Sequence, residues 1–259
     1  MKALRVLVCM KAVRETGAGQ VDGAAAADRD RADLRWNIAD ESALEAALRL
    51  AGGEGRVTVL TMGPPKLENL LRELVARGVD AAVLITDRLM AGADTHATAV
   101  ALKAAAEKLG PFDLIFCGRR AIDGETGQVP GELAAALHLP CISEVERADL
   151  RDGALVLSRR LEEGTQELQA ASPLVVSFCE YAYPLRLPGI LGLRRAKKAP
   201  VTIYGAADLG LRAGDCGQSG SLTEVASAEL RLPGLRHGAR QADLRAGAAR
   251  LLEMIREAR

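Results

Sequence analysis

The sequence predicts an α/β fold with a mostly parallel, doubly wound sheet, added antiparallel strands and a C-terminal arm. Short apolar runs alternate with amphipathic stretches through the first half of the chain. After Pro140 the runs are separated by polar turns, and the last residues carry a separate amphipathic pattern. Continuous apolar strands joined by helices form parallel sheets that are covered on both faces.

Four strands, with helices between them, are expected in the first half. The strands are the apolar runs at residues 4–10, 57–62, 81–86 and 114–117. One buried helix face follows the i, i+3, i+4, i+7 spacing, and Gly78 stands where that helix would stop. The apolar positions of this face are Leu67, Leu70, Leu71, Leu74 and Val75. A strand, helix, strand order of this kind indicates parallel neighbours.

The second half is expected to add antiparallel strands and then an arm. The expected strands are the runs at 141–145, 154–158, 167–171 and 174–178, which are separated by polar turns. Prolines and glycines indicate an irregular exposed segment at 181–200, and a loosely structured connection is expected at 205–238. The terminal helix has one apolar face, made of Leu244, Ala248, Leu251, Leu252 and Ile255.

These patterns divide the chain into two regions. An α/β domain is predicted at residues 1–204, and an extension at 205–259 whose terminal helix docks on another surface.

Composition excludes several classes of protein. Lys plus Arg and Asp plus Glu are 34 each, so no positive field favours nucleic acid or anionic lipid. The five cysteines lie far apart without a C-x-x-C pair, which indicates reduced thiols and no zinc site. No histidine has an evident nucleophile beside it, so hydrolytic catalysis is not expected. The first apolar run is too short for a signal peptide or a membrane span, and a cytoplasmic protein is expected.

The segment from Gly118 to Pro130 is the most informative part of the sequence. It follows the expected strand at 114–117 and precedes an expected helix through residues 133–137. Ligands of parallel sheets bind at the carboxyl ends of the strands, and glycines beside a helix start favour phosphate. Spacing alone leaves two interpretations open, a phosphate site and an ordinary glycine-rich turn.

The order of residues in this segment resembles the nucleotide loop of electron transfer flavoprotein beta subunits. Further matches follow in the same order: the first strand with Lys11, Asn37 before residues 41–50, residues 61–65, and residues 92–95 with Thr98. The most diagnostic match is the family signature at Arg159, Glu162, Glu163, Gly164, Gln166, Leu168, Pro173, Val175 and Val176. The resemblance covers about residues 3–204 and implies a Rossmann-like, adenine-nucleotide-binding sheet.

The resemblance further implies that the chain holds FAD or AMP. Beta subunits of this family carry a structural AMP or, in electron-bifurcating members, a second FAD. Residues 123–129 look like the FAD-type loop, because AMP-type members are more polar and bulkier at the central positions. A diphosphate also needs more open backbone than a monophosphate, and Gly124 and Gly127 provide it. The positions that match the family's nucleotide site are Cys9, Asn37, Asp40, Met62, Gly63, Thr95, Thr98, Gly118, Arg119, Arg120, Ala121, Asp123, Gly124, Glu125, Thr126, Gly127, Gln128 and Val129.

The matched residues would have different roles. Cys9 and Met62 at strand ends would line the adenine or ribose pocket, with simple core packing as the alternative interpretation. The alternative interpretation of Thr95 and Thr98 is that they are only residues at the start of a helix. The loop amides would hold phosphate, and any redox chemistry would belong to a flavin.

The resemblance also implies partners. Residues 183–198 resemble the recognition loop, in which a leucine anchors a flavin dehydrogenase, and Leu187 is the matching position. A solvated basic loop is the alternative interpretation of this segment.

The implied function is an electron-carrying subunit rather than an enzyme by itself. Beside a FAD-carrying alpha subunit, it would shuttle electrons between a flavin dehydrogenase or NADH and a downstream acceptor, with bifurcation as one mode. The alternative is a stand-alone adenine-nucleotide-binding regulator similar to universal stress proteins. The signature at 159–176 favours the electron carrier.

Overall fold

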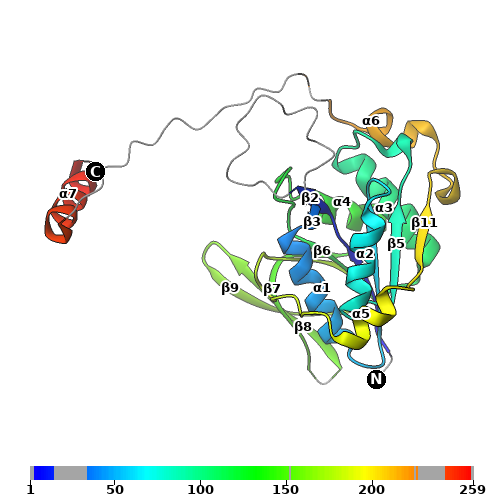
Figure 1. Cartoon of the computed structure of the whole chain (residues 1–259), viewed down its shortest axis with the longest axis horizontal. Helices are drawn as coiled ribbons and strands as arrows, with labels where there is room; N and C mark the ends of the chain where they lie inside the picture. Colours follow the sequence, from blue (N-terminus) through cyan, green and yellow to red (C-terminus); the bar gives the residue numbers. More distant parts are fainter. Residues whose placement is uncertain (1–2, 15–33, 152, 225, 227–242, 258–259) are drawn as a thin grey trace. The chain divides into compact units, whose positions relative to one another are not determined.

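The computed structural model describes residues 3–14, 34–151, 153–224, 226 and 243–257 (Figure 1). The chain forms two compact units, Met1–Glu224 and Val225–Arg259. Of the predicted extension at 205–259, residues 225, 227–242 and 258–259 therefore lie outside the described part. The first unit runs on through Glu224, past the predicted boundary at residue 204.

The first unit is built on a nine-stranded sheet in the described residues, in the order β11-β5-β4-β1-β6-β10-β7-β8-β9. From β11 to β7 all neighbouring strands are parallel, whereas β8 and β9 are antiparallel additions. The strands are β1 (Arg5–Cys9), β4 (Arg56–Met62), β5 (Ala81–Ile85), β6 (Leu114–Gly118), β7 (Cys141–Arg151), β8 (Ala154–Leu161), β9 (Gly164–Ala170), β10 (Leu174–Phe178) and β11 (Val201–Tyr204). The predicted α/β class, with a mostly parallel sheet and added antiparallel strands, is confirmed.

Two strands that were expected to be antiparallel additions belong to the parallel sheet. β10 lies between β6 and β7 and is parallel to both. Its side chains are all buried, which is typical of a parallel strand covered on both faces. β7 pairs in parallel with β10 near its start and antiparallel with β8 further along. The antiparallel pairing expected for these two strands was wrong, because polar turns indicate where strands end and not which strands pair.

Helices cover both faces of the sheet (Figure 1). One core cluster joins Val6 and Val8 to α1 and α2, and the other joins Leu7 to α3 and α4. Alternate side chains of β1 thus point to opposite faces, as the doubly wound prediction requires. The helices are α1 (Ile38–Ala51), α2 (Leu67–Ala76), α3 (Thr95–Leu109), α4 (Val129–Ala136), α5 (Ile190–Ala196), α6 (Gly217–Gly220) and α7 (Leu244–Glu257).

The segment at 181–200 is more ordered than its prolines and glycines suggested, because it contains α5. This helix packs on α2 through Gly192, where a side-chain Cβ would lie 2.1 Å from the carbonyl oxygen of Ala76. Arg195 also donates a hydrogen bond of 3.0 Å to the carbonyl of Val75 at the end of α2. The close helix contact fixes α5 despite its short length.

The residues after β11 form short helical turns, which are η3 (Ala207–Leu209), η4 (Ala213–Asp215) and α6; a further turn, η2 (Arg88–Met90), follows β5. A small antiparallel pair of strands is formed by β2 (Ala12–Arg14) and β3 (Leu34–Trp36).

In the second unit, α7 confirms the expected terminal helix and leaves its large apolar side chains exposed. Among the described residues, no helix combines the length and apolar character that a membrane span requires.

Candidate functional site

The order of the strands reverses between β1 and β6. The chain builds the sheet outward from β1 to β4 and β5, and α3 then returns it to β6 on the other side of β1. Cys9 and Cys117 face each other in register near the carboxyl ends of these two strands. In open α/β sheets, ligands bind outside the carboxyl ends of the strands at this reversal. The candidate site is therefore the edge of the sheet above β1 and β6.

Asp40 ties the ends of β1 and β6 together from the first turn of α1. Its Oδ1 accepts a hydrogen bond of 2.7 Å from the Gly118 amide, and its Oδ2 accepts one of 2.8 Å from the Lys11 amide. Position 118 must be glycine for this contact, since a Cβ there would lie 2.3 Å from Asp40 Oδ1.

The ionisation of Asp40 is set mainly by its burial. Burial raises the pKa of Asp40 from 3.8 to about 7, although the amides of Lys11 and Gly118 oppose this rise. The folded state therefore binds this proton more tightly than the unfolded state does. This tighter proton binding contributes to the free energy of unfolding. The contribution is present in full below pH 3.8 and is lost as the pH rises through about 7.

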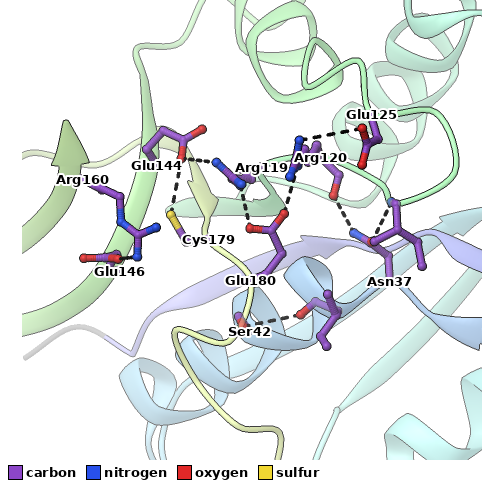
Figure 2. Close-up of polar contacts among 12 residues, drawn as sticks. Asn37, Ser42, Arg119, Arg120, Glu125, Glu144, Glu146, Arg160, Cys179 and Glu180 are labelled. Atoms are coloured by element: carbon purple, nitrogen blue, oxygen red, sulfur yellow. Dashed lines mark hydrogen bonds and ion pairs between the residues drawn. The ribbon is translucent and has the colours of Figure 1, made fainter. Parts of the chain in front are cut away.

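Asn37 and Lys11 shape the first half of the loop that follows β6. The Asn37 Nδ2 donates to the carbonyl of Arg120 at 2.9 Å, and its Oδ1 accepts from the Ile122 amide at 3.2 Å (Figure 2). The Lys11 ammonium forms an ion pair of 2.7 Å with Asp123. These contacts fix the loop path up to Asp123.

The second half of the loop is exposed and has unused backbone donors. In the described part of the chain, the amides of Gly124, Thr126 and Gly127 donate to no protein acceptor. A Cβ at Gly124 would meet no atom within 4 Å, and Gly127 has a φ of 66°. This stretch leads into the N-terminus of α4, where helix amides add to the field that favours an anion.

Side chains from α3 and α4 stand beside this exposed stretch. The Thr95 hydroxyl lies 2.9 Å from Glu132 Oε1 and 3.3 Å from Gln128 Oε1. Glu132 Oε2 is buried and, within the described residues, has no hydrogen-bond partner. Sequence reasoning selected Thr95 and Gln128 but missed Glu132, which only the packing of α4 against α3 brings into place.

Two arginines of the loop meet acidic residues from β7 and from the end of β10 (Figure 2). Arg119 donates to Glu180 at 2.7 Å and to Glu144 at 2.8 Å. Arg120 donates to the other oxygen of Glu180 at 3.1 Å. Glu180 is thus shared by both arginines, and the guanidinium of Arg120, whose side chain is 40% exposed, also lies 4.0 Å from Glu125. The Glu144 and Glu180 contacts were also missed, because no local pattern indicates them.

Ionisation in this cluster follows from these contacts. Burial alone would raise the pKa of Glu180, but its own backbone amide and the two arginines lower it. Burial raises the pKa of the neighbouring Cys179 thiol to about 11, and the Glu144 carboxylate adds to this rise. Glu180 is therefore a fixed negative charge at the base of the loop, and Cys179 stays a neutral thiol.

The other predicted positions follow the carboxyl ends of neighbouring strands. Cys9 ends β1 and is buried, while Met62 ends β4 and Gly63 follows it. Thr98 lies in the first turn of α3. Together with Asn37, Asp40, Thr95 and residues 118–129, the predicted positions come from five separate chain segments.

Leu187 lies on a different part of the unit, just before α5. Its side chain is 85% exposed, and Ile190 and Leu191 nearby are 75% and 78% exposed. Arg186 beside it binds the buried carboxylate of Glu45 at 2.9 Å, which attaches this segment to α1. The segment therefore presents apolar side chains from a fixed backbone.

A doubly wound sheet with a glycine-containing loop at its reversal point defines the Rossmann-like class of α/β proteins. The electron transfer flavoprotein domain matches residues 26–209 of this chain. The chain belongs to the electron transfer flavoprotein family, and the electron-transfer function expected from its sequence is confirmed.

Several relatives share most of their length with this chain. The electron transfer flavoprotein subunit beta of Thermoanaerobacterium thermosaccharolyticum is 37% identical over 225 residues, which is 86% of each chain. The caffeyl-CoA reductase-Etf complex subunit CarD of Acetobacterium woodii is 35% identical over 225 residues, again 86% of each chain. Protein FixA of Azorhizobium caulinodans is 40% identical over 198 residues, covering 73% of this chain and 70% of FixA. These names confirm the resemblance to beta-type subunits.

Proposed function

We propose that the edge of the sheet above β1 and β6 binds FAD, with AMP as the alternative nucleotide. The observation that carries this proposal is the exposed half of the loop, where three amides lack acceptors among the described residues and Gly124 leaves open space. Phosphate oxygens are the acceptors that such amides at a helix start favour. A diphosphate fits better than a monophosphate, because the open backbone extends over several residues.

The residues of the site divide into those that shape it and those that would touch the nucleotide. Asp40 and Asn37 hold the loop, and their polar atoms are already used. The amides of Gly124, Thr126 and Gly127 would bind phosphate, and Arg120 would add to this contact by exchanging its present partners, Glu180 and Glu125. When bound, a flavin supplies the electron-transfer chemistry, while the chain supplies its position and electrostatic surroundings.

The chain works beside a larger, FAD-carrying alpha subunit in this proposal. The apolar side chains of α7 are Leu244, Leu251, Leu252, Met254 and Ile255, and all are at least 49% exposed. Exposed apolar side chains on one helix indicate a surface that another protein covers. The extension at 205–259, and α7 in particular, would supply this contact in the cytoplasm.

Electron donors would meet the chain at a second place. Leu187, Ile190 and Leu191 are exposed apolar side chains close together in the sequence, and α5 and the turn after it carry Arg194, Arg195, Lys197 and Lys198. A flavin dehydrogenase would dock there, with Leu187 as the buried anchor of the contact.

Co-expression tests the obligate partner. We expect the chain and its alpha subunit to co-purify as a yellow heterodimer with a higher melting temperature than the chain alone, because binding the native state stabilises it. The proposal would be contradicted by a colourless chain that does not bind the alpha subunit and has the same melting temperature with and without it. ATP binding by a homodimer would favour the regulator instead.

A further inference from the structure

The segment that leads out of the first unit is fastened to the start of α3. This exit segment, residues 213–224, contains η4 and α6 and ends where the first unit ends. Gln218 donates from its backbone to the carbonyl of Ala91 at 3.1 Å. At Gly217, which has a φ of 53°, a Cβ would lie 2.2 Å from the carbonyl oxygen of Leu89. Such a close backbone approach admits only glycine, so the exit segment has one defined position.

Asp94 is the centre of this attachment, and its two oxygens have different partners. Oδ1 accepts from the Ala97 amide at 2.9 Å and caps α3. Oδ2 accepts from the amides of Leu222 and Thr223 at 2.8 and 2.9 Å, and from the Thr223 hydroxyl at 2.9 Å. The Asp94 amide also donates to the Ser221 hydroxyl at 2.9 Å.

The same turn of chain faces the candidate nucleotide site. Thr95, which follows Asp94, is the residue whose hydroxyl contacts Gln128 and Glu132. The capping oxygen of Asp94 therefore holds Thr95 in place, while the other oxygen holds the last residues before Val225. One carboxylate joins the nucleotide site to the exit of the extension.

We propose that Asp94 is a positioning residue that fixes where the C-terminal extension leaves the nucleotide-binding unit, and that the larger flavin-carrying subunit needs this attachment for tight binding. This inference rests on the proposed function, in which the extension docks on that subunit. Releasing Leu222 and Thr223 adds an ordering cost to this binding, because the start of the extension must then be ordered when the alpha subunit binds.

The attachment does not depend on pH in the range where the protein would be studied. Burial alone would raise the pKa of Asp94, but the hydrogen bonds from Ala97, Thr223 and Leu222 lower it to about 2. The carboxylate thus stays ionised, and substitutions rather than pH are the way to test it.

The variant Asp94→Asn separates the two functions of this carboxylate, which are capping α3 and accepting hydrogen bonds from Leu222 and Thr223. Asparagine is a good helix cap, so its oxygen retains the bond from Ala97. Its amide nitrogen then faces the donors of Leu222 and Thr223 and cannot accept from them. Asp94→Ala removes both the cap and the acceptor for Leu222 and Thr223, and Thr223→Val removes the hydroxyl donor alone. Asp80→Asn is the matched control, because Asp80 also accepts a hydrogen bond from a distant amide, that of Val57 at 2.8 Å, and it lies at the other end of β5 from the turn that contacts the exit segment.

Two measurements on the full chain with the alpha subunit test the inference. In Asp94→Asn we expect amide hydrogen exchange at Leu222 and Thr223 to speed up at least about tenfold, because their acceptor is lost. The dissociation constant should rise about threefold or more, because the exit segment must be ordered on binding. Nucleotide retention should stay near that of the wild type in Asp94→Asn and fall only in Asp94→Ala. Asp80→Asn should leave exchange at these two amides unchanged.

The outcomes separate this inference from the proposed function. If wild-type chain fails to bind the alpha subunit, the proposed function is wrong and this inference falls with it. If wild type binds and Asp94→Asn binds equally well, the inference alone is overturned. Unchanged exchange at Leu222 and Thr223 in a folded Asp94→Asn would overturn it as well.

Discussion

Gly124→Val is expected to abolish nucleotide binding while the protein keeps its fold. A Cβ at position 124 meets no protein atom within 4 Å, and the loop is exposed there. The folded chain therefore has room for the valine, and we expect the free energy of unfolding to change by about 0.5 kcal/mol or less. The two added methyl groups would instead fill the space where phosphate must approach the backbone. Nucleotide content after purification measures the loss.

Gly53→Val is the matched control for this variant. A Cβ at Gly53 would likewise meet no atom within 4 Å, and its φ lies outside the left-handed region. Gly53 precedes the amino end of β4, however, and so lies away from the candidate site. The Gly53→Val protein should retain nucleotide as the wild type does. A folded Gly124→Val protein with unchanged nucleotide content would contradict the assignment of the loop.

Gly118→Ala is expected to have the opposite effect and destabilise the fold itself. The added Cβ would lie 2.3 Å from Asp40 Oδ1 and 2.7 Å from the Cβ of Ala39, both buried at the start of α1. Either α1 or β6 must move, and the hydrogen bond from the Gly118 amide to Asp40 is lost. Overpacking and a broken buried hydrogen bond together predict a loss of about 3 kcal/mol.

Unfolding in urea measures this loss, and Gly124→Ala is the control. The two substitutions add the same methyl group, one at the end of β6 and one in the loop that follows, but only position 118 is closely packed. Gly124→Ala should leave the urea midpoint unchanged. Equal midpoints for Gly118→Ala and the wild type would mean that Asp40 does not tie β6 to α1 as described.

Local patterns were sufficient for the positions of most elements. The strands at 4–10 and 114–117 were found within one residue at each end, because continuous apolar runs in a parallel sheet are buried on both faces. Their neighbours in the sheet could not be found in the same way. β10 looked like one more run between turns, yet it lies in the middle of the parallel sheet.

The candidate site was predictable where it depends on the loop and not where it depends on tertiary packing. Residues 118–129 form one continuous stretch, so a resemblance could identify them. The Asp40 bond to Gly118 spans 78 positions, and the Glu180 bond to Arg119 spans 61. Contacts at such separations depend on the strand order, which periodicity does not contain. Glu132, Glu144 and Glu180 were missed for this reason.

The nucleotides released from the purified heterodimer test the central claim most directly. If the edge above β1 and β6 binds FAD, denaturing the complex of this chain with its alpha subunit should release close to two FAD per heterodimer. The Gly124→Val complex should release only the FAD of the alpha subunit. One FAD with one AMP would contradict the choice of FAD for this chain. One FAD with no second nucleotide from the wild-type complex would contradict the site itself.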